Sequence, residues 1–196
     1  MISYDEFLRR DWLNPHVEWV RGEVVEMPPI GDVHADLNDL LRAVVRIFVE
    51  RRKLGIVRSD PFNMKLGPDL SGRAPDLMFI AKSHQRRVRK THLEGPADLV
   101  IEIISPGSRG VDRGDKFYEY EQGGVPEYWL IDPERRVAEF YRLAGRGKDR
   151  RYRAMTVDDD GTFGSAILQP FWINVNWLWQ RPLPEVLEVL SKIDAD

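Results

Sequence analysis

The sequence predicts a single α/β domain with a mixed central sheet, flanking helices and extra antiparallel strands. Residues 98–104 are almost continuously apolar, as in a central strand that is covered on both faces. A helix-compatible segment at residues 111–121 and a β-prone segment at residues 127–132 follow. This strand–helix–strand order favours a right-handed, parallel connection. At 196 residues the chain has the length of one domain, residues 1–196.

A short helix and a pair of strands are expected at the N-terminal end. Ser3 and Glu6 have the spacing of a capping box, which predicts a helix through Leu8. Residues 16–27 then form two β-prone segments around a turn. In the first of these segments, Glu18 faces away from its apolar neighbours.

A long amphipathic helix is expected next. Asp32 can cap its N-terminus, and Gly55 is expected to end it. Residues 56–59 and 62–66 are then expected to form a hairpin, before a buried strand at residues 76–80. The apolar stripe of the helix consists of Leu37, Leu41, Val44 and Phe48.

The last third of the chain is expected to hold an antiparallel pair at residues 137–143 and 152–157. A closing amphipathic helix is expected at residues 184–193. Three tryptophans lie between the second strand of this pair and the closing helix. They are expected to fill the core or a subunit interface rather than to stack on bases. They are Trp172, Trp177 and Trp179.

Composition limits the classes of function. The hydrophobic share of 42% and the charged share of 31% are typical of a soluble globular protein. The sequence has no cysteine, so any metal must be held by oxygen or imidazole ligands. Without a signal-like N-terminus or an apolar run of bilayer length, we expect a cytoplasmic protein with no membrane partner. The net charge of -3 argues against strong nonspecific binding of nucleic acid, although a local basic patch could still line a groove.

Two carboxylates in predicted central strands are the candidate metal ligands. Glu102 interrupts an apolar strand, where a charge is costly unless it is paired, hydrogen-bonded or bound to metal. Asp76 follows Pro75 at the head of another predicted strand, so both carboxylates could converge on one hard cation, Mg²⁺ or Mn²⁺. The alternative is that Asp76 caps a turn and that Glu102 pairs with a buried arginine.

The predicted helix after this strand has a candidate cation. Asp112 and Lys116 are four residues apart, and Tyr120 continues the same helix face. Lys116 could stabilise negative charge at a phosphate or orient an attacking water. The alternative is an ordinary ion pair with Asp112, and the spacing leaves both readings open.

Taken in series, these motifs resemble the Uma-type putative restriction endonucleases, a family of the PD-(D/E)XK nuclease-like superfamily. The resemblance spans the chain from Tyr4 to about Trp179. Its motifs are residues 75–76, residues 102–106, Asp112 with Lys116 and Tyr120, residues 124–132 and, upstream, residues 17–19, residues 22–27 and His34.

The resemblance implies a restriction-endonuclease-like fold and hydrolysis of DNA phosphodiester bonds. It implies that Asp76 and Glu102 are ligands of a catalytic Mg²⁺ or Mn²⁺, and that the backbone carbonyl of Ile103 is a further ligand. The superfamily usually has a lysine two residues after the glutamate, but this chain has Ile104 there. The resemblance implies that the role of this lysine has moved to the following helix in this family, and Lys116 is the matching residue.

Further residues match family positions that contact substrate or support the ligands. Glu18 matches an acidic position and could be another metal ligand; the alternative is a solvated strand carboxylate. His34 could meet phosphate at the start of the long helix, and the alternative is a surface histidine. Ser105 is expected to form hydrogen bonds at the strand end rather than to act as a nucleophile. Asp112 and Tyr120 are assigned to the same supporting group.

Two basic clusters are candidates for phosphate binding. Residues 51–53 end the long helix, where the helix dipole already favours cations. Residues 86–90 lie in a predicted loop and are better placed for phosphate, and the alternative is a solvated surface.

The sequence therefore predicts a metal-dependent endonuclease that acts on DNA as a homodimer, so that both strands can be cut. The rival hypothesis is a nuclease-fold protein for nucleic-acid binding or assembly that cuts weakly or not at all. Ile104 and the acidic net charge keep this rival open. The sequence does not distinguish DNA from RNA as the substrate.

Overall fold

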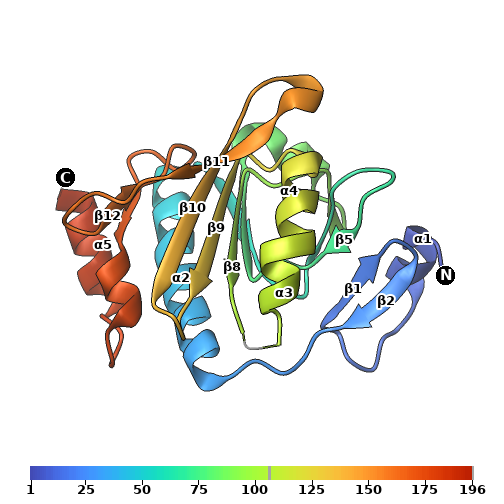
Figure 1. Ribbon diagram of the computed structural model, residues 1–196, viewed down its shortest axis with the longest axis horizontal. Coiled ribbons are helices and arrows are strands. Elements are labelled where there is room, and N and C mark those ends of the chain that lie inside the picture. The colour runs from blue at the N-terminus through green and yellow to red at the C-terminus, as the bar shows by residue number, and fades with distance from the viewer. Residues whose placement is uncertain (106, 196) are drawn as a thin grey trace.

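The centre of the protein is a six-stranded mixed sheet (Figure 1). A computed structural model describes residues 1–105 and 107–195. The strand order is β11-β10-β9-β8-β6-β3. Strands β8 and β9 are parallel, and all other neighbouring pairs are antiparallel. The strands are β3 (Gly55–Arg58), β6 (Leu77–Ala81), β8 (Leu99–Ile103), β9 (Glu127–Asp132), β10 (Val137–Ala144) and β11 (Arg151–Met155).

A second sheet of five short strands has the order β2-β1-β5-β4-β7. Figure 1 shows β1 and β2 beside α1 at the end of the molecule away from the C-terminus. The strands of this sheet are β1 (Val17–Val20), β2 (Glu23–Glu26), β4 (Asn63–Lys65), β5 (Gly72–Arg73) and β7 (His92–Glu94). A separate pair consists of β12 (Thr162–Gly164) and β13 (Trp172–Asn174).

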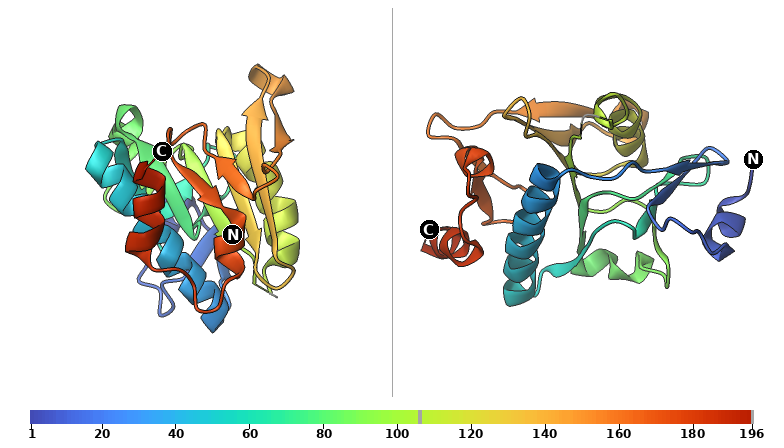
Figure 2. Two further views of the ribbon diagram at one scale, coloured as in Figure 1. Left: turned by 90° about the vertical axis from the view of Figure 1, so that its left-hand side faces the viewer. Right: turned by 90° about the horizontal axis from the view of Figure 1, so that it is seen from below.

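The helices cover both faces of the central sheet, with α2 on one face and α3 and α4 on the other (Figure 2). The α-helices are α1 (Tyr4–Arg9), α2 (Asp32–Arg52), α3 (Arg109–Val111), α4 (Phe117–Gly123) and α5 (Val186–Ala195). A π-helical turn, η2 (Asp112–Lys116), joins α3 to α4. The 3-10 helices of the described residues are η1 (Lys82–Arg87), η3 (Gly147–Asp149) and η4 (Val175–Trp179).

Each face of β8 contributes to a different hydrophobic cluster, which explains its continuous apolar sequence. Leu99 and Ile101 pack in the cluster that includes α2 and α5, whereas Val100 and Ile104 pack in the cluster that includes α4. Side chains alternate along a strand, so Glu102 faces the α4 side. The parallel β8–β9 pair around the helical crossover confirms the predicted strand–helix–strand unit.

The structure confirms several local predictions. Ser3 caps α1, because its Oγ accepts a hydrogen bond from the Glu6 amide at 3.1 Å. Strands β10 and β11 form the predicted antiparallel pair, and α5 is the predicted closing helix. Trp177 is buried, and Trp172 and Trp179 pack against the same core. Within the described residues, no helix has the length and apolar character needed to cross a membrane.

The predicted hairpin of residues 56–59 and 62–66 is wrong. Strand β3 pairs with β6 in the central sheet, whereas β4 pairs with β5 and β7 in the second sheet. The chain changes sheets at Asp60 and Pro61, between the two strands. Residue alternation indicates that a segment is a strand, but it carries no information on which distant strand is its partner.

Both predicted ends of α2 need correction. Asp32 is the first helical residue, and Gly31 occupies the N-cap position without a side-chain hydrogen bond. The helix ends at Arg52, and Lys53 is its C-cap, in a left-handed conformation with φ of 54°. Gly55 instead begins β3, where a Cβ atom would lie 2.1 Å from the carbonyl oxygen of Ile80. The close approach of β6, rather than a helix cap, requires glycine there.

Candidate active site

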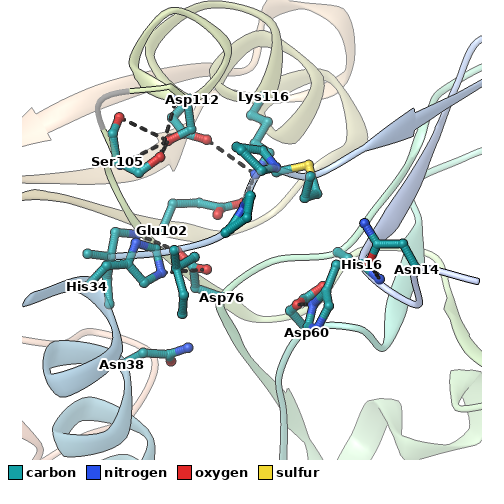
Figure 3. A pocket seen from close by; sticks show the side chains of 17 residues that line it. Asn14, His16, His34, Asn38, Asp60, Asp76, Glu102, Ser105, Asp112 and Lys116 are labelled. Atoms are coloured by element: carbon teal, nitrogen blue, oxygen red, sulfur yellow. Dashed lines mark hydrogen bonds and ion pairs between the residues drawn. The ribbon is translucent and has the colours of Figure 1, made fainter. Parts of the chain in front are cut away.

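A cavity of about 470 Å³ brings most of the predicted site residues together (Figure 3). It lies where the N-terminal half of α2, the start of β6, the end of β8 and η2 meet. Two of the predicted residues, Glu18 and Tyr120, are not part of its lining but contact residues that are. The predicted residues in the lining are His34, Asp76, Glu102, Ile103, Ser105, Asp112 and Lys116.

Asp76 lies directly before β6, next to the end of β8. The register pairs Leu77 with Ile101, which places Asp76 beside the C-terminal end of the neighbouring strand. Its Oδ2 accepts a hydrogen bond from the Ile103 amide at 2.7 Å, and its Oδ1 lies 3.2 Å from Nε2 of His34. The carboxylate is thus held from both sides at the edge of the cavity.

Glu102 is buried, with 2% of its surface exposed. Its Oε1 accepts a hydrogen bond from the Tyr120 hydroxyl at 2.5 Å and lies 3.1 Å from Nζ of Lys116. Burial raises the pKa of Glu102 to about 8, against the opposing effect of Lys116, and the nearby Asp76 adds to the rise. The cation that contacts Glu102 is Lys116, whereas the alternative hypothesis expected a buried arginine.

Lys116 is buried among three carboxylates. Its Nζ lies 3.1 Å from Glu102, 3.2 Å from Asp112 and 3.6 Å from Glu18. Burial acts to lower the pKa of Lys116, but the three carboxylates outweigh it and hold the pKa well above its ordinary value. The lysine is therefore charged, and it forms the helical pair with Asp112 while also reaching Glu102. The ion pair with Asp112 that the spacing allowed is thus present, and a part for Lys116 at a phosphate stays a prediction.

Glu18 belongs to a buried ionic network, so the solvated alternative is wrong. Only 1% of Glu18 is exposed, and its Oε2 accepts a hydrogen bond from Nη1 of Arg73 at 2.8 Å. The Nε of Arg73 donates to Glu119 at 2.7 Å, and Ser71 donates to the other oxygen of Glu119 at 2.8 Å. Desolvation acts to raise the pKa of Glu18, but Lys116 and Arg73 lower it below its ordinary value.

His34 and Ser105 complete the predicted set. His34 is buried rather than on the surface, with 6% of its area exposed. Its Nδ1 has no hydrogen-bond partner within the described residues. Ser105 and Ser108 exchange backbone-to-hydroxyl hydrogen bonds at 3.0 and 3.3 Å, which is the strand-end bonding expected of Ser105.

Comparisons with known proteins identify the family. A family model described as Uma2, putative restriction endonuclease, matches residues 4–176. The chain belongs to the Uma2 family. This match confirms the resemblance seen in the motifs, all of which lie within the matched residues. No curated protein matches the chain.

A solved structure shows the same fold as this Uma2 chain. It is the crystal structure of a putative nuclease belonging to DUF820 from Anabaena variabilis ATCC 29413. The two chains are 18% identical, and the match covers 91% of this chain and 98% of the other, with a TM-score of 0.75. The likeness confirms the predicted mixed α/β class.

The Uma2 site includes residues that the sequence analysis missed. His16 Nδ1 pairs with Oδ2 of Asp60 on the side of the cavity opposite His34 (Figure 3). Asn38 is four residues after His34 and lies on the same face of α2, so helical spacing could have found it. No pattern in the sequence indicated Arg73, because its partners come from other segments of the chain.

The polar atoms around the cavity suit a hard divalent cation and a hydrated ligand. The described residues contain no group of three or more His, Asp and Glu side chains arranged to hold a metal. A cation at Asp76 and Glu102 would therefore need the Ile103 carbonyl and water, an all-oxygen set of the kind that Mg²⁺ accepts. Among the described residues, His34 Nδ1, Asn38 Oδ1 and Asp60 Oδ1 are buried without a hydrogen-bond partner. Such atoms at a cavity wall favour a bound ligand or water.

Proposed function

We propose that this Uma2 protein is a divalent-metal-dependent endonuclease that hydrolyses DNA phosphodiester bonds. Membership of a family of putative restriction endonucleases supports nucleic-acid hydrolysis in general. The observation that carries the more specific proposal is the position of Lys116 Nζ, 3.1 Å from Glu102, beside a cavity that Asp76 also lines. Two carboxylates, one directly before β6 and one on the adjacent strand β8, and one cation are the groups that metal-assisted phosphodiester hydrolysis needs.

In this proposal Asp76, Glu102 and the Ile103 carbonyl hold Mg²⁺ or Mn²⁺. The metal, when bound, would activate water and neutralise charge on the phosphate. The Ile103 amide and His34 orient Asp76, through the contacts at 2.7 and 3.2 Å. Tyr120 holds one oxygen of Glu102 by its hydrogen bond.

In this proposal Lys116 replaces the catalytic lysine that the superfamily usually has two residues after the glutamate, where this chain has Ile104. Ile104 packs in the cluster on the α4 side of β8, the side toward which Glu102 also faces. A lysine at 104 and a lysine on η2 would therefore approach Glu102 from the same side of the sheet. Lys116 stabilises the negative charge that develops on the phosphate, while Glu18 and Asp112 position its ammonium group.

Cleavage of plasmid DNA tests the proposal. Wild-type protein should nick or linearise plasmid in the presence of Mg²⁺ or Mn²⁺, and Asp76→Asn should lose this activity by about 100-fold or more, because a neutral amide is a weaker metal ligand than a carboxylate. Asp159→Asn, at an exposed position, is the matched control and should cut like wild type. Equal cleavage by all three proteins would indicate a contaminating nuclease and contradict the proposal.

Calorimetric titration with Mn²⁺ separates the nuclease from its rival. The rival, a nuclease-fold binding protein that cuts weakly or not at all, gains support from Ile104 and from the three carboxylates that already neutralise Lys116. The nuclease proposal requires saturable Mn²⁺ binding to wild type that Asp76→Asn weakens. Absence of Mn²⁺ binding together with absence of cleavage would favour the rival.

The proposal includes a homodimer, so that two sites can cut both strands. The tryptophans that could form its interface pack against the core of their own chain; Trp177 is buried, and Trp172 and Trp179 are partly exposed. Light scattering should give twice the mass of one chain, and a monomer at high concentration would contradict this part of the proposal.

A further inference from the structure

A second cavity, of about 480 Å³, adjoins the candidate active site, and Asp60 lines both. Three arginines line this second cavity: Arg42 and Arg46 from α2, and Arg58 from β3. We propose that this arginine groove binds the phosphodiester backbone of DNA beside the bond to be cut. The inference rests on the proposed nuclease function, and it adds a substrate contact that lies outside the carboxylate site.

The groove lies beside the segment that holds Asp76, as one backbone hydrogen bond and the register of β3 with β6 show. The amide of Asp60 donates to the carbonyl of Pro75 at 3.0 Å, and Pro75 directly precedes Asp76. The β3–β6 register pairs Arg58 with Met78, two residues beyond Asp76. A strand of DNA that places one phosphate at Asp76 would therefore pass its neighbouring phosphates over the groove.

The arginines retain most of their hydrogen-bond donors. Within the described part of the chain each has one side-chain hydrogen bond. Arg42 Nη1 contacts Ser59 Oγ at 3.5 Å, Arg46 Nε donates to Glu50 at 2.8 Å, and Arg58 Nη1 donates to the Val57 carbonyl at 2.9 Å. A guanidinium group has five N–H donors, and its planar fork matches phosphate oxygens.

The local charge is favourable although the chain as a whole is acidic. Asp60 is the only acidic residue in the described lining, and it already pairs with His16, while Glu50 outside the lining pairs with Arg46. The lining also includes Thr91, which directly follows the basic residues 86–90. A groove with an excess of arginine concentrates positive potential where a net charge of -3 would not predict it. The groove thus offers a place for DNA on a protein with little general attraction for it.

The test is binding of a short fluorescent DNA duplex, measured by anisotropy over a series of salt concentrations. All proteins are full chains with Asp76→Asn, so that cleavage does not disturb the measurement. The groove variant adds Arg42→Gln, Arg46→Gln and Arg58→Gln. Its affinity should fall by about tenfold or more, and the slope of log affinity against log salt should shrink by about 2 to 3.

The matched control removes the same charge at the opposite edge of the central sheet. It adds Arg135→Gln, Arg146→Gln and Arg153→Gln to the Asp76→Asn background; all three are exposed, and they lie in or beside β10 and β11. The control should bind DNA within about threefold of the parent, because its charges lie away from the groove. Unchanged melting temperatures would show that all three proteins are folded.

Two results would overturn the groove. One is a groove variant that binds DNA no more weakly than the control variant, which would show either no contribution of the groove or an effect of net charge alone. The other is an absence of DNA binding by the parent protein. If either result is found and wild type cleaves plasmid, DNA binding by the groove is contradicted and the nuclease proposal is retained. If DNA binding depends on the groove but no cleavage is found, the nuclease proposal is contradicted and the groove is retained.

Discussion

Replacing Arg73 with alanine should lower the free energy of unfolding by about 3–5 kcal/mol, one of the largest effects expected of a single substitution in this protein. Arg73 is 2% exposed, and its guanidinium group joins Glu18 on β1 to Glu119 on α4. Without this guanidinium group, Glu18 and Glu119 remain buried with less positive charge to offset their desolvation. The buried pair need not be strongly stabilising for its disruption to be costly.

Urea unfolding measures this effect. Arg153→Ala, an exposed arginine on β11, is the matched control and should change the free energy of unfolding by less than about 0.5 kcal/mol. The double variant Arg73→Ala with Glu119→Gln should lose less than the sum of the two single variants, because the residues are in contact. A loss below about 1 kcal/mol for Arg73→Ala would contradict the network.

The same ionic network determines how the stability of the folded protein changes with pH. The pKa of Glu18 is lowered in the folded protein, by Lys116 and Arg73 against desolvation. Its contribution to stability is therefore present above the ordinary pKa of 4.5 and is lost as the pH falls through the lowered pKa. Removal of Arg73 takes away part of this contribution, so the stability gap between wild type and Arg73→Ala should narrow as the pH falls below about 4.5.

Replacing Lys116 with methionine should lower plasmid cleavage by about 100- to 1,000-fold, the usual cost of removing one group that stabilises the transition state. Methionine has about the length of the lysine stem and removes the charge. The proposed metal ligands Asp76 and Glu102 remain, so Mn²⁺ binding should persist. It should even strengthen, because a positive charge 3.1 Å from Glu102 is gone.

The combination of retained Mn²⁺ binding and lost cleavage separates a catalytic lysine from a purely structural one. Lys192→Met is the matched control, since Lys192 forms an exposed pair with Glu188 at four-residue spacing and should leave cleavage unchanged. Near-wild-type cleavage by a folded Lys116→Met protein would show that Lys116 has no catalytic part. Loss of both metal binding and cleavage would point to a collapsed site instead.

Patterns within one segment predicted their own structure well. The apolar run around Glu102 became the central strand β8, and the spacing of Asp112, Lys116 and Tyr120 became one face of the crossover helix. These patterns succeed because the alternation of a strand and the turn of a helix are local properties of the chain. They also located the carboxylates and the cation of the candidate site.

Contacts between distant segments were outside the reach of such patterns. The sequence identified β3 and β4 as strands but paired them with each other, whereas the fold places them in different sheets. It singled out Glu18 without its partner Arg73, and it gave no sign that Arg42 and Arg58 line a common groove.

The amino-acid sequence by itself determined the family, the class of fold and the strand on which Glu102 lies. Only the tertiary structure decided what compensates that carboxylate: Tyr120 and Lys116 from one helix, with Glu18 and Arg73 behind them. The reason is physical. Periodicity determines which way a side chain faces, but the charge it meets there depends on how separate elements pack.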